Sequence, residues 1–325
     1  METKRPTVPA AEEIVGGYFP VLDHGFVSLV DYMGSDEDVE RAARVSYGFG
    51  TRKVSQTRGL VRYLRRHRHT TPSEMVEFKF HCAMPMFVAR QWIRHRTASV
   101  NELSARYSLM PLLFYRPEAE QFALQSRSNK QGREAGAPAE VYQQAVDRWE
   151  DLRTAASDAY KWLLEEDVAR EIARIDLPVS MYTQWYWKID LHNLLHFLSL
   201  RVDPRAQWEI QQFAGVIAGM VKRVAPLSYE AWVDYDLAGQ SMSRAELTAI
   251  SRLIEPVDGG VGAREGAILT AEELGEVGMS PREARELLEK LQAPARPDFE
   301  LDLGGMRSAE VVAAEMYEAV PSTFE

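Results

Sequence analysis

Residues 94–107 read Arg-His-Arg-Thr-Ala-Ser-Val-Asn-Glu-Leu-Ser-Ala-Arg-Tyr, and the apolar stretch Pro-Met-Phe-Val-Ala-Arg-Gln-Trp-Ile at residues 85–93 leads into them. A proline suits the first turn of a helix, so residues 85–93 predict a helix with one buried apolar stripe. The members of that stripe are Phe87, Val88, Trp92 and Ile93. Several arginines then lie beside the stripe. Because a buried guanidinium needs an anion or a carboxylate for its planar fork of donors, the stretch predicts a bound anion.

The same polar side chains also have a simpler interpretation. A solvated basic turn, closed by salt bridges to Glu102, would need no ligand, and exposed charge runs of this kind are common. The residues alone leave both interpretations open.

The composition is that of an ordinary soluble globular protein. The chain has 325 residues, 46% hydrophobic and 26% charged, which is enough for a full core in one large domain or two. No apolar run approaches the roughly 18 to 20 residues that span a bilayer, and the first residues lack the apolar segment of a signal peptide. We therefore expect a cytoplasmic protein without a membrane partner.

The net charge of −10 is unevenly distributed. Residues 241–325 contain 17 acidic and 8 basic side chains, a net charge of −9, which leaves about −1 for residues 1–240. A nearly neutral region with a local basic cluster suits a small anionic substrate. It argues against nucleic-acid binding, which needs a basic face.

The single cysteine, Cys82, cannot form an internal disulfide, which fits a reducing compartment. It belongs to residues 76–82, an alternating and aromatic-rich run that predicts a strand. We interpret Cys82 as a small packed residue rather than a nucleophile.

Local patterns predict the remaining elements. Helices are expected at residues 36–45, 56–68, 139–166, 168–178 and 190–201, with Ser35 or Asp36 capping the first and Asp190 capping the last. The helix at 139–166 takes its expected apolar face from Val141, Ala145, Trp149, Leu152, Ala156, Tyr160 and Leu163. Residues 180–188 predict a strand. The fold class is α+β, with helices packed around a small, mainly antiparallel sheet.

Residues 94–106 match the pattern Arg-His-Arg, two residues, Ser, four residues, Ser, one residue, Arg, and in this they resemble the flavin-dependent thymidylate synthases. The likeness extends from about Tyr18 to about Leu237. It includes His-x-His-x-Thr-Pro-x-Glu at residues 67–74 and Ala-Arg-x-x-Leu-Pro at residues 173–178. A pattern this long with fixed polar positions is highly specific.

The resemblance implies conversion of dUMP to dTMP. In that reaction 5,10-methylenetetrahydrofolate gives the carbon unit, FAD carries the hydride and NADPH is the reductant. It also implies a homotetramer whose sites are shared between subunits.

The resemblance further implies the residues of the site. Nucleotide contacts are implied for Gln91, Trp92, Ile93, Arg94, Glu102, Leu103, Ser104, Ala105, Arg106, Arg174 and Arg201. Flavin contacts are implied for His69, Thr71, Arg94, His95, Arg96, Glu102, Asp190, His192 and His196. Arg201 is the implied catalytic residue, because an arginine at the N3 and O2 edge favours the deprotonated uracil ring. Many members carry Asn and Arg where this chain has Asp190 and His192.

Two histidine pairs have spacings compatible with a metal ion, namely His67 with His69 and His192 with His196. Neither pair has a third ligand close in sequence, so we expect no metal. A non-catalytic nucleotide-binding protein is the rival class, and nucleic-acid binding by the basic segments is a second rival.

The expected organisation has three parts. Residues 1–17 form a flexible tail, residues 18–240 the catalytic domain, and residues 241–325 an acidic, mostly helical extension. In the extension, Ser280 and Glu283 fit a capping box with Pro281 in the first turn. We expect the extension to pack on the core or on a neighbouring subunit, and truncation at Gln240 to leave flavin binding largely intact.

Overall fold

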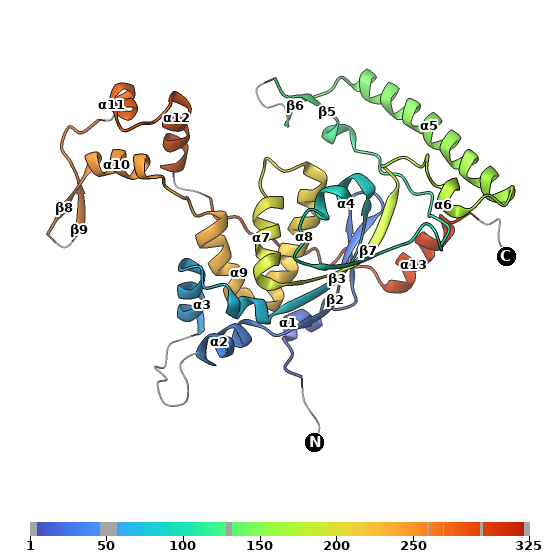
Figure 1. Ribbon diagram of the computed structural model, residues 1–325, viewed down its shortest axis with the longest axis horizontal. Coiled ribbons are helices and arrows are strands. Elements are labelled where there is room, and N and C mark those ends of the chain that lie inside the picture. Colours follow the sequence, from blue (N-terminus) through green and yellow to red (C-terminus); the bar gives the residue numbers. More distant parts are fainter. Residues whose placement is uncertain are drawn as a thin grey trace. The chain divides into compact units, whose positions relative to one another are not determined.

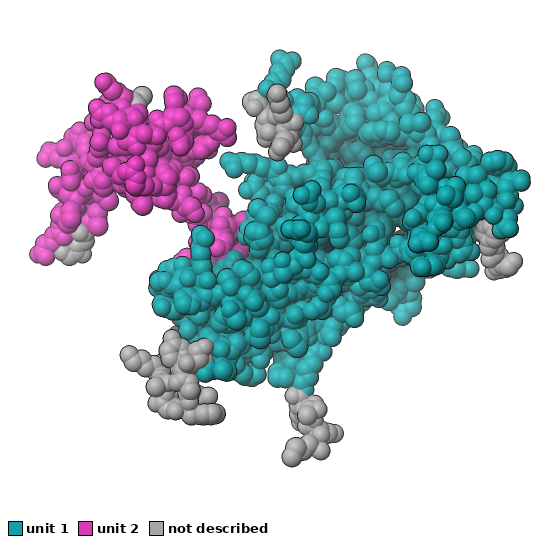
Figure 2. Space-filling view, viewed as in Figure 1, with its two compact units in different colours: residues 1–230, 299–325 teal, residues 231–298 magenta. Residues whose placement is uncertain are grey.

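The computed structural model describes residues 5–45, 57–127, 132–258, 260–268, 270–292 and 295–321. The chain divides into two compact units (Figure 2). Unit 1 contains Met1–Glu230 and Phe299–Glu325, and unit 2 contains Ala231–Asp298. None of the helices described combines the length and the apolar composition that a bilayer span requires.

The centre of unit 1 is a five-stranded sheet with the strand order β1-β2-β3-β7-β4. Its strands are β1 (Tyr18–Val21), β2 (Gly25–Met33), β3 (Glu77–Pro85), β7 (Tyr182–Asp190) and β4 (Ser99–Glu102). All neighbouring strands are antiparallel, which confirms the predicted fold class. Strand β4 was not predicted, because its residues were interpreted only as part of the anion-binding stretch.

One face of the sheet is made of large apolar side chains because β3 and β7 alternate in phase. Trp185 lies opposite Cys82, Trp187 opposite Phe80, and Ile189 opposite Phe78. All six are buried. The expected strand around Cys82 and its packed interior position are confirmed.

Three helices cover this apolar face: α4 (Met86–Trp92), α7 (Leu191–Arg201) and α8 (Trp208–Val224) (Figure 1). Trp92 fixes α4 against the sheet. Its ring centroid is 5.1 Å from that of Trp187 and 5.0 Å from that of Phe197 on α7. The expected helix after Pro85 is therefore confirmed, but Ile93 is 38% exposed and does not belong to the buried stripe.

Helices α2 (Asp36–Val45) and α3 (Thr57–Arg66) precede the 3-10 helix η1 (Thr71–Met75). The bounds of α2 agree with the prediction, and the expected start of α3 at Gln56 lies outside the described residues. Asp36 accepts hydrogen bonds from Leu227 N at 2.7 Å and Ser228 N at 2.8 Å. These bonds join α2 to the start of α9 (Pro226–Trp232).

Helix α5 (Ala139–Glu165) has nearly the predicted bounds, and its buried face agrees with the prediction in part: Tyr160 is buried, and Ala145, Trp149, Ala156 and Leu163 are half-buried. Val141 is 46% and Leu152 is 67% exposed, whereas Val146 and Leu164 are buried. The sequence preceding α5 forms η2 (Ala119–Gln121) and a hairpin of β5 (Ala123–Gln125) and β6 (Arg133–Gly136), and the short helix α6 (Arg170–Ala173) follows α5.

The segment before the sheet is packed rather than a tail over the part that is described. Helix α1 (Pro9–Glu12) is followed by Ile14, and both Ala11 and Ile14 are fully buried. Arg223 on α8 donates to Ala10 O at 2.8 Å. This differs from the expected flexible tail at residues 1–17.

The end of the chain returns to unit 1, so the residues after position 240 are divided between the two units. Tyr18 and Arg307 exchange two backbone hydrogen bonds, of 3.0 and 2.8 Å. A Cβ at Gly219 on α8 would meet Leu301 Cγ at 2.9 Å, so this approach requires a glycine. Helix α13 (Ala309–Glu318) then packs Val312 against Phe26 and Ala83.

Unit 2 is a small helical body with its own core of Ala249, Leu274, Met279 and Leu287. Its elements are the π-helix η3 (Val233–Leu237), α10 (Arg244–Leu253), β8 (Ile254–Val257), β9 (Gly260–Ala263), α11 (Ala271–Glu276) and α12 (Pro281–Lys290). Capping boxes start α10, α11 and α12, and the predicted box of Ser280 and Glu283 is among them.

Candidate functional site

The C-terminal end of α7 brings Arg201 to the turn between α4 and β4. Arg201 Nε donates to His95 Nε2 at 3.0 Å, and Arg201 Nη2 donates to Gln91 O at 3.3 Å. The His196 ring lies 6.2 Å from the His95 ring. The structure therefore brings together four of the predicted site residues. Gln91 and His95 precede His196 and Arg201 by about a hundred positions in the chain. We call Gln91, His95, His196 and Arg201 the arginine group.

His95 is neutral in this arrangement. Its Nε2 accepts a hydrogen bond from Arg201, so the ring proton is on Nδ1. Burial, with the charge of Arg201 and the neighbouring His196, lowers the pKa of His95 from 6.5 to about 4. Burial also lowers the pKa of Arg201, which stays far above neutral pH as a guanidinium.

This depressed pKa predicts a pH dependence of stability. Between pH 6.5 and about 4 the unfolded chain binds a proton at His95 that the folded chain does not. The free energy of unfolding therefore falls as pH is lowered through this window, and the contribution is fully present above it. Chemical denaturation measures the free energy of unfolding at pH 7 and at pH 5. The decrease between the two pH values should be smaller for His95→Asn than for the parent protein. The matched variant His67→Asn should lose as much as the parent, and equal losses in all three would contradict the prediction.

Residues 102–108 form a tight turn at the far end of β4. Glu102 accepts from Thr183 Oγ1 at 2.7 Å, and Leu103 N donates to Gln184 O at 2.9 Å. Ser104 O accepts from Tyr107 N and Ser108 N at 3.1 and 3.0 Å. Arg106 Nε pairs with Glu171 at 2.8 Å.

Arg174 lies at the end of α6, the helix that also carries Glu171, and is half-buried. We call Glu102, Ser104, Arg106 and Arg174 the turn group. Because the turn group follows β4 and the arginine group contacts the turn before β4, the two groups lie at opposite ends of this strand in one protomer.

A third set of predicted residues lies at the start of α7. Asp190 accepts from Asn193 N at 2.9 Å and from Asn193 Nδ2 at 2.7 Å, so its carboxylate caps the helix as expected. His192 follows in the first turn, and its Nδ1 is buried without a hydrogen-bond partner among the described residues. His69 and Thr71 lie at the start of η1, and His69 is 6.0 Å from the Tyr63 ring.

Two of the predicted nucleotide contacts are core residues. Trp92 is fully buried beneath α7 and Ala105 is buried with Met110 and Met181. Their side chains are therefore closed to a ligand, so any nucleotide contact of these two residues would be made by the backbone.

Three predicted cations have no carboxylate partner among the residues that the structure describes. These are Arg94, Arg96 and Arg174, whereas Arg106 is paired with Glu171. Unpaired guanidinium groups create a positive local potential that attracts a compact anion. The ion-pair interpretation of the basic turn through Glu102 is wrong, because Glu102 binds Thr183 instead.

Sequence reasoning missed two residues that hold this site. Thr183 fixes Glu102, and Gln207 accepts a hydrogen bond from the Gln91 side chain. The only signal was the position of Gln207 in the stretch Ala-Gln-Trp-Glu-Ile after Arg201. In the described part of the chain, no three His, Cys, Asp or Glu side chains are placed to hold a metal ion together.

Comparisons with known proteins define the class. Residues 28–227 match the family described as thymidylate synthase complementing protein. A flavin-dependent thymidylate synthase from Ehrlichia ruminantium (strain Gardel) is 49% identical over 289 residues, which are 89% of this chain and 93% of the relative. One from Gluconobacter oxydans (strain 621H) is 52% identical over 256 residues, 77% of this chain and 84% of the relative.

Solved structures agree with this class. The UMP/dUMP methylase PolB from Streptomyces cacaoi, bound with 5-Br UMP, is similar with a TM-score of 0.62 and 35% identity. The match covers 68% of this chain and 100% of the methylase chain. The chain belongs to the family of flavin-dependent thymidylate synthases, and it is an enzyme.

The donors on this chain fit a flavin dinucleotide. His192 presents a buried nitrogen without a partner in the described chain, and Arg94 and Arg96 have no carboxylate partners there. Imidazoles suit the polar edge of a flavin ring, and guanidinium groups suit its phosphates. Asp190 is already engaged as a helix cap.

Proposed function

We propose that the enzyme converts dUMP to dTMP, with 5,10-methylenetetrahydrofolate as carbon donor, FAD as hydride carrier and NADPH as reductant. The observation that carries the proposal is the half-buried guanidinium of Arg201, held by His95 and Gln91 without a carboxylate partner in the described chain. Such a group is preorganised to stabilise negative charge on a bound ring.

The turn group would bind the nucleotide phosphate. The backbone N–H groups of Ser104 and Ala105, which have no acceptor in the described chain, would donate to the phosphate, as would the Ser104 hydroxyl. The guanidinium groups of Arg106 and Arg174 are donors of the kind that charge-assisted phosphate binding uses. The Arg106–Glu171 pair is exposed, so exchanging Glu171 for a phosphate has a small cost. Gln91, Arg94 and Glu102 would orient the sugar and the base.

Arg201 would act on the pyrimidine. Its remaining N–H donors, directed at N3 and O2, favour the deprotonated ring and raise the electron density at C5. FAD would be held by His69, Thr71, Arg94, His95, Arg96, His192 and His196. Glu102 and Asp190 would also contact it. When bound, FAD supplies the hydride that completes the methyl group, and NADPH restores its two electrons.

A homotetramer with shared sites is part of the proposal. The arginine group and the turn group lie at opposite ends of β4. A complete site would therefore combine the arginine group of one protomer with the turn group of another. Apolar side chains near the turn group are more than half exposed, as expected of a surface that another subunit covers. They are Tyr107, Ile172, Ile175 and Val179.

Cys82 has no part in the proposed reaction. Its thiol is fully buried within the sheet, and burial raises its pKa far above neutral pH. Cys82→Ala should therefore keep turnover within about twofold of the parent while stability falls by about 1 kcal/mol for the small cavity. Loss of turnover in a variant that still melts cooperatively would refute this assignment.

Release of tritium from dUMP labelled at C5 tests the proposed function. The purified enzyme should contain bound flavin and should release tritium only when the folate donor and NADPH are both present. A protein that binds dUMP without releasing tritium would belong to the non-catalytic rival class. A steep salt dependence of duplex DNA affinity would instead support nucleic-acid binding.

A further inference from the structure

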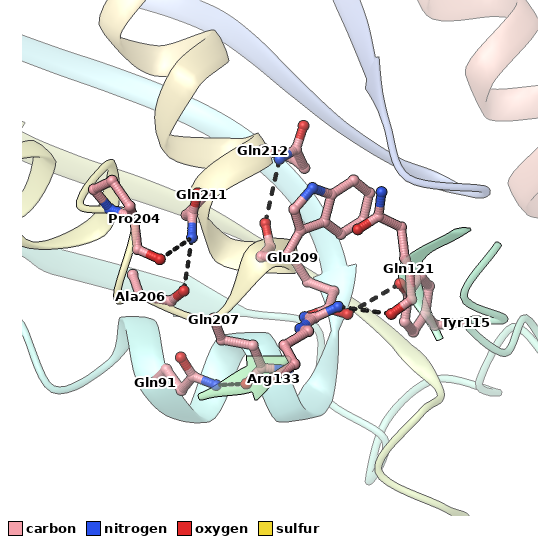
Figure 3. Close-up of polar contacts among 11 residues, drawn as sticks. Gln91, Tyr115, Gln121, Arg133, Pro204, Ala206, Gln207, Glu209, Gln211 and Gln212 are labelled. Carbon is pink, nitrogen blue, oxygen red and sulfur yellow. Dashed lines mark hydrogen bonds and ion pairs between the residues drawn. The ribbon is translucent and has the colours of Figure 1, made fainter. Parts of the chain in front are cut away.

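The loop that joins α7 to α8 is fastened at both ends to one residue, Gln91. At its start, Arg201 Nη2 donates to Gln91 O at 3.3 Å. At its end, Gln207 Oε1 accepts a hydrogen bond from Gln91 Nε2 (Figure 3). Gln91 therefore links the two ends of the loop. Its carbonyl accepts from Arg201 Nη2 and also from Arg94 N at 3.4 Å, and its carboxamide donates to Gln207.

A side chain of α8 also hydrogen-bonds to carbonyl groups within this loop. Gln211 Nε2 donates to Ala206 O at 2.7 Å and to Pro204 O at 3.4 Å. Arg205 N donates to Asp203 Oδ1 at 2.7 Å. Figure 3 shows the Gln211 carboxamide directed at the two loop carbonyls.

The first turn of α8 is anchored in turn by a buried carboxylate. Glu209 is 4% exposed, pairs with Arg133 at 2.8 Å and accepts from Tyr115 Oη at 3.2 Å. Arg133 also donates to Gln121 O at 2.9 Å. Gln207 thus extends from a fixed helix start, two residues before Glu209.

Packing does not orient the Gln207 side chain. It is exposed and lines an open pocket of about 700 Å³ together with Arg205, Trp208 and Arg133. In the described chain, its hydrogen bond to Gln91 is the one polar contact that fixes its carboxamide. The same bond fixes the carboxamide of Gln91, a half-buried residue.

We propose that Gln207 is a positioning residue that orients the Gln91 carboxamide toward the nucleotide and closes the loop that follows Arg201. This inference rests on the proposed function, because that function assigns Gln91 and Arg201 to dUMP. A carboxamide held in the bound orientation avoids an ordering cost on binding. The effect is on binding of the ground state and the transition state alike, so it should appear in KM rather than in kcat.

Gln207→Met tests the proposal, because it keeps the length of the side chain and removes the acceptor. The KM for dUMP should rise roughly three- to tenfold, as the loss of one hydrogen bond predicts, while kcat changes by less than about twofold. Gln207→Glu keeps an acceptor for Gln91 and should restore KM to within about twofold of the parent. Gln212→Met is the matched control, because the one hydrogen bond of the Gln212 side chain among the described residues is to Trp208 O on its own helix, at 3.4 Å. The KM of this variant should be unchanged.

A second comparison separates positioning from general loosening of the fold. If Gln207 acts through Gln91, then Gln207→Met should have no further effect on KM in a Gln91→Met background. Effects that multiply, or a Gln207→Met enzyme that matches Gln212→Met, would overturn the proposal. Gln207→Ala removes the same acceptor and replaces the methionine variant if that variant does not fold.

Measurements on the parent enzyme distinguish a failure of the proposed function from a failure of the positioning role of Gln207. Calorimetry should detect dUMP binding and the tritium assay should detect turnover before any variant is compared. If both are absent, the proposed function is wrong and the inference falls with it. If both are present and Gln207→Met is unchanged, only the positioning role is wrong.

Discussion

Arg201→Lys is expected to fold and to keep its flavin, but to turn over roughly a hundredfold more slowly. The guanidinium uses one N–H on His95 and another on Gln91 O, and its remaining donors are free to face the ring. A lysine ammonium is a point donor that cannot hold both internal partners and a planar substrate edge at once. The loss expected is that of one preorganised charge-stabilising donor.

Three measurements on one sample check this prediction. Far-ultraviolet circular dichroism reports the fold, visible absorbance reports the flavin, and initial rates at saturating dUMP report kcat. Arg116→Lys is the matched control, because Arg116 is exposed and pairs with Glu150 on α5. Near-normal kcat in Arg201→Lys would exclude the proposed role of this residue in the reaction.

Removal of residues 299–325 is expected to unfold unit 1 or to leave it unable to fold. The truncated chain loses the backbone pair of Tyr18 with Arg307 and uncovers Phe26 and Ala83, which Val312 now covers. Leu301 would also leave the surface at Gly219. The expectation from sequence, that truncation at Gln240 leaves flavin binding largely intact, does not agree with these contacts.

Two neighbouring valines on α13 give this prediction a controlled form. Val312 is 4% exposed and Val311 is 48% exposed. Val312→Ala should lower the free energy of unfolding of unit 1 by about 2 kcal/mol, whereas Val311→Ala should change it by less than about 0.5 kcal/mol. Denaturant titration followed by tryptophan fluorescence measures both, and equal midpoints for the two variants would show that the C-terminal segment does not stabilise unit 1.

Elements with strong local signals were predictable from sequence. The α2 bounds, the Asp190 cap of α7 and the Ser280 capping box each depend on residues within one turn of one another. Strand β4 was missed because Val100 and Glu102 carry no apolar alternation of their own. Their strand conformation depends on pairing with Trp187 and Trp185 of β7.

Contacts between distant residues were beyond local reasoning. The family likeness pointed to Arg201 and His95 separately, but nothing in the residues predicted that one donates to the other. The buried face of α5 was predicted only in part, for a related reason. Val141 and Leu152 fit the helical period, yet both are exposed, because the period of a helix shows which residues share a face and not which part of that face another element covers.

The return of the C-terminal segment to Tyr18 has a consequence for synthesis of the chain. Residues 231–298 must leave the ribosome before residues 299–325 can complete unit 1. At elongation rates of about 5 to 20 residues per second, the stretch from Ala83 to Val312 takes roughly 10 to 50 seconds to synthesise, and the apolar patch at Phe26 and Ala83 stays uncovered for that time on the nascent chain.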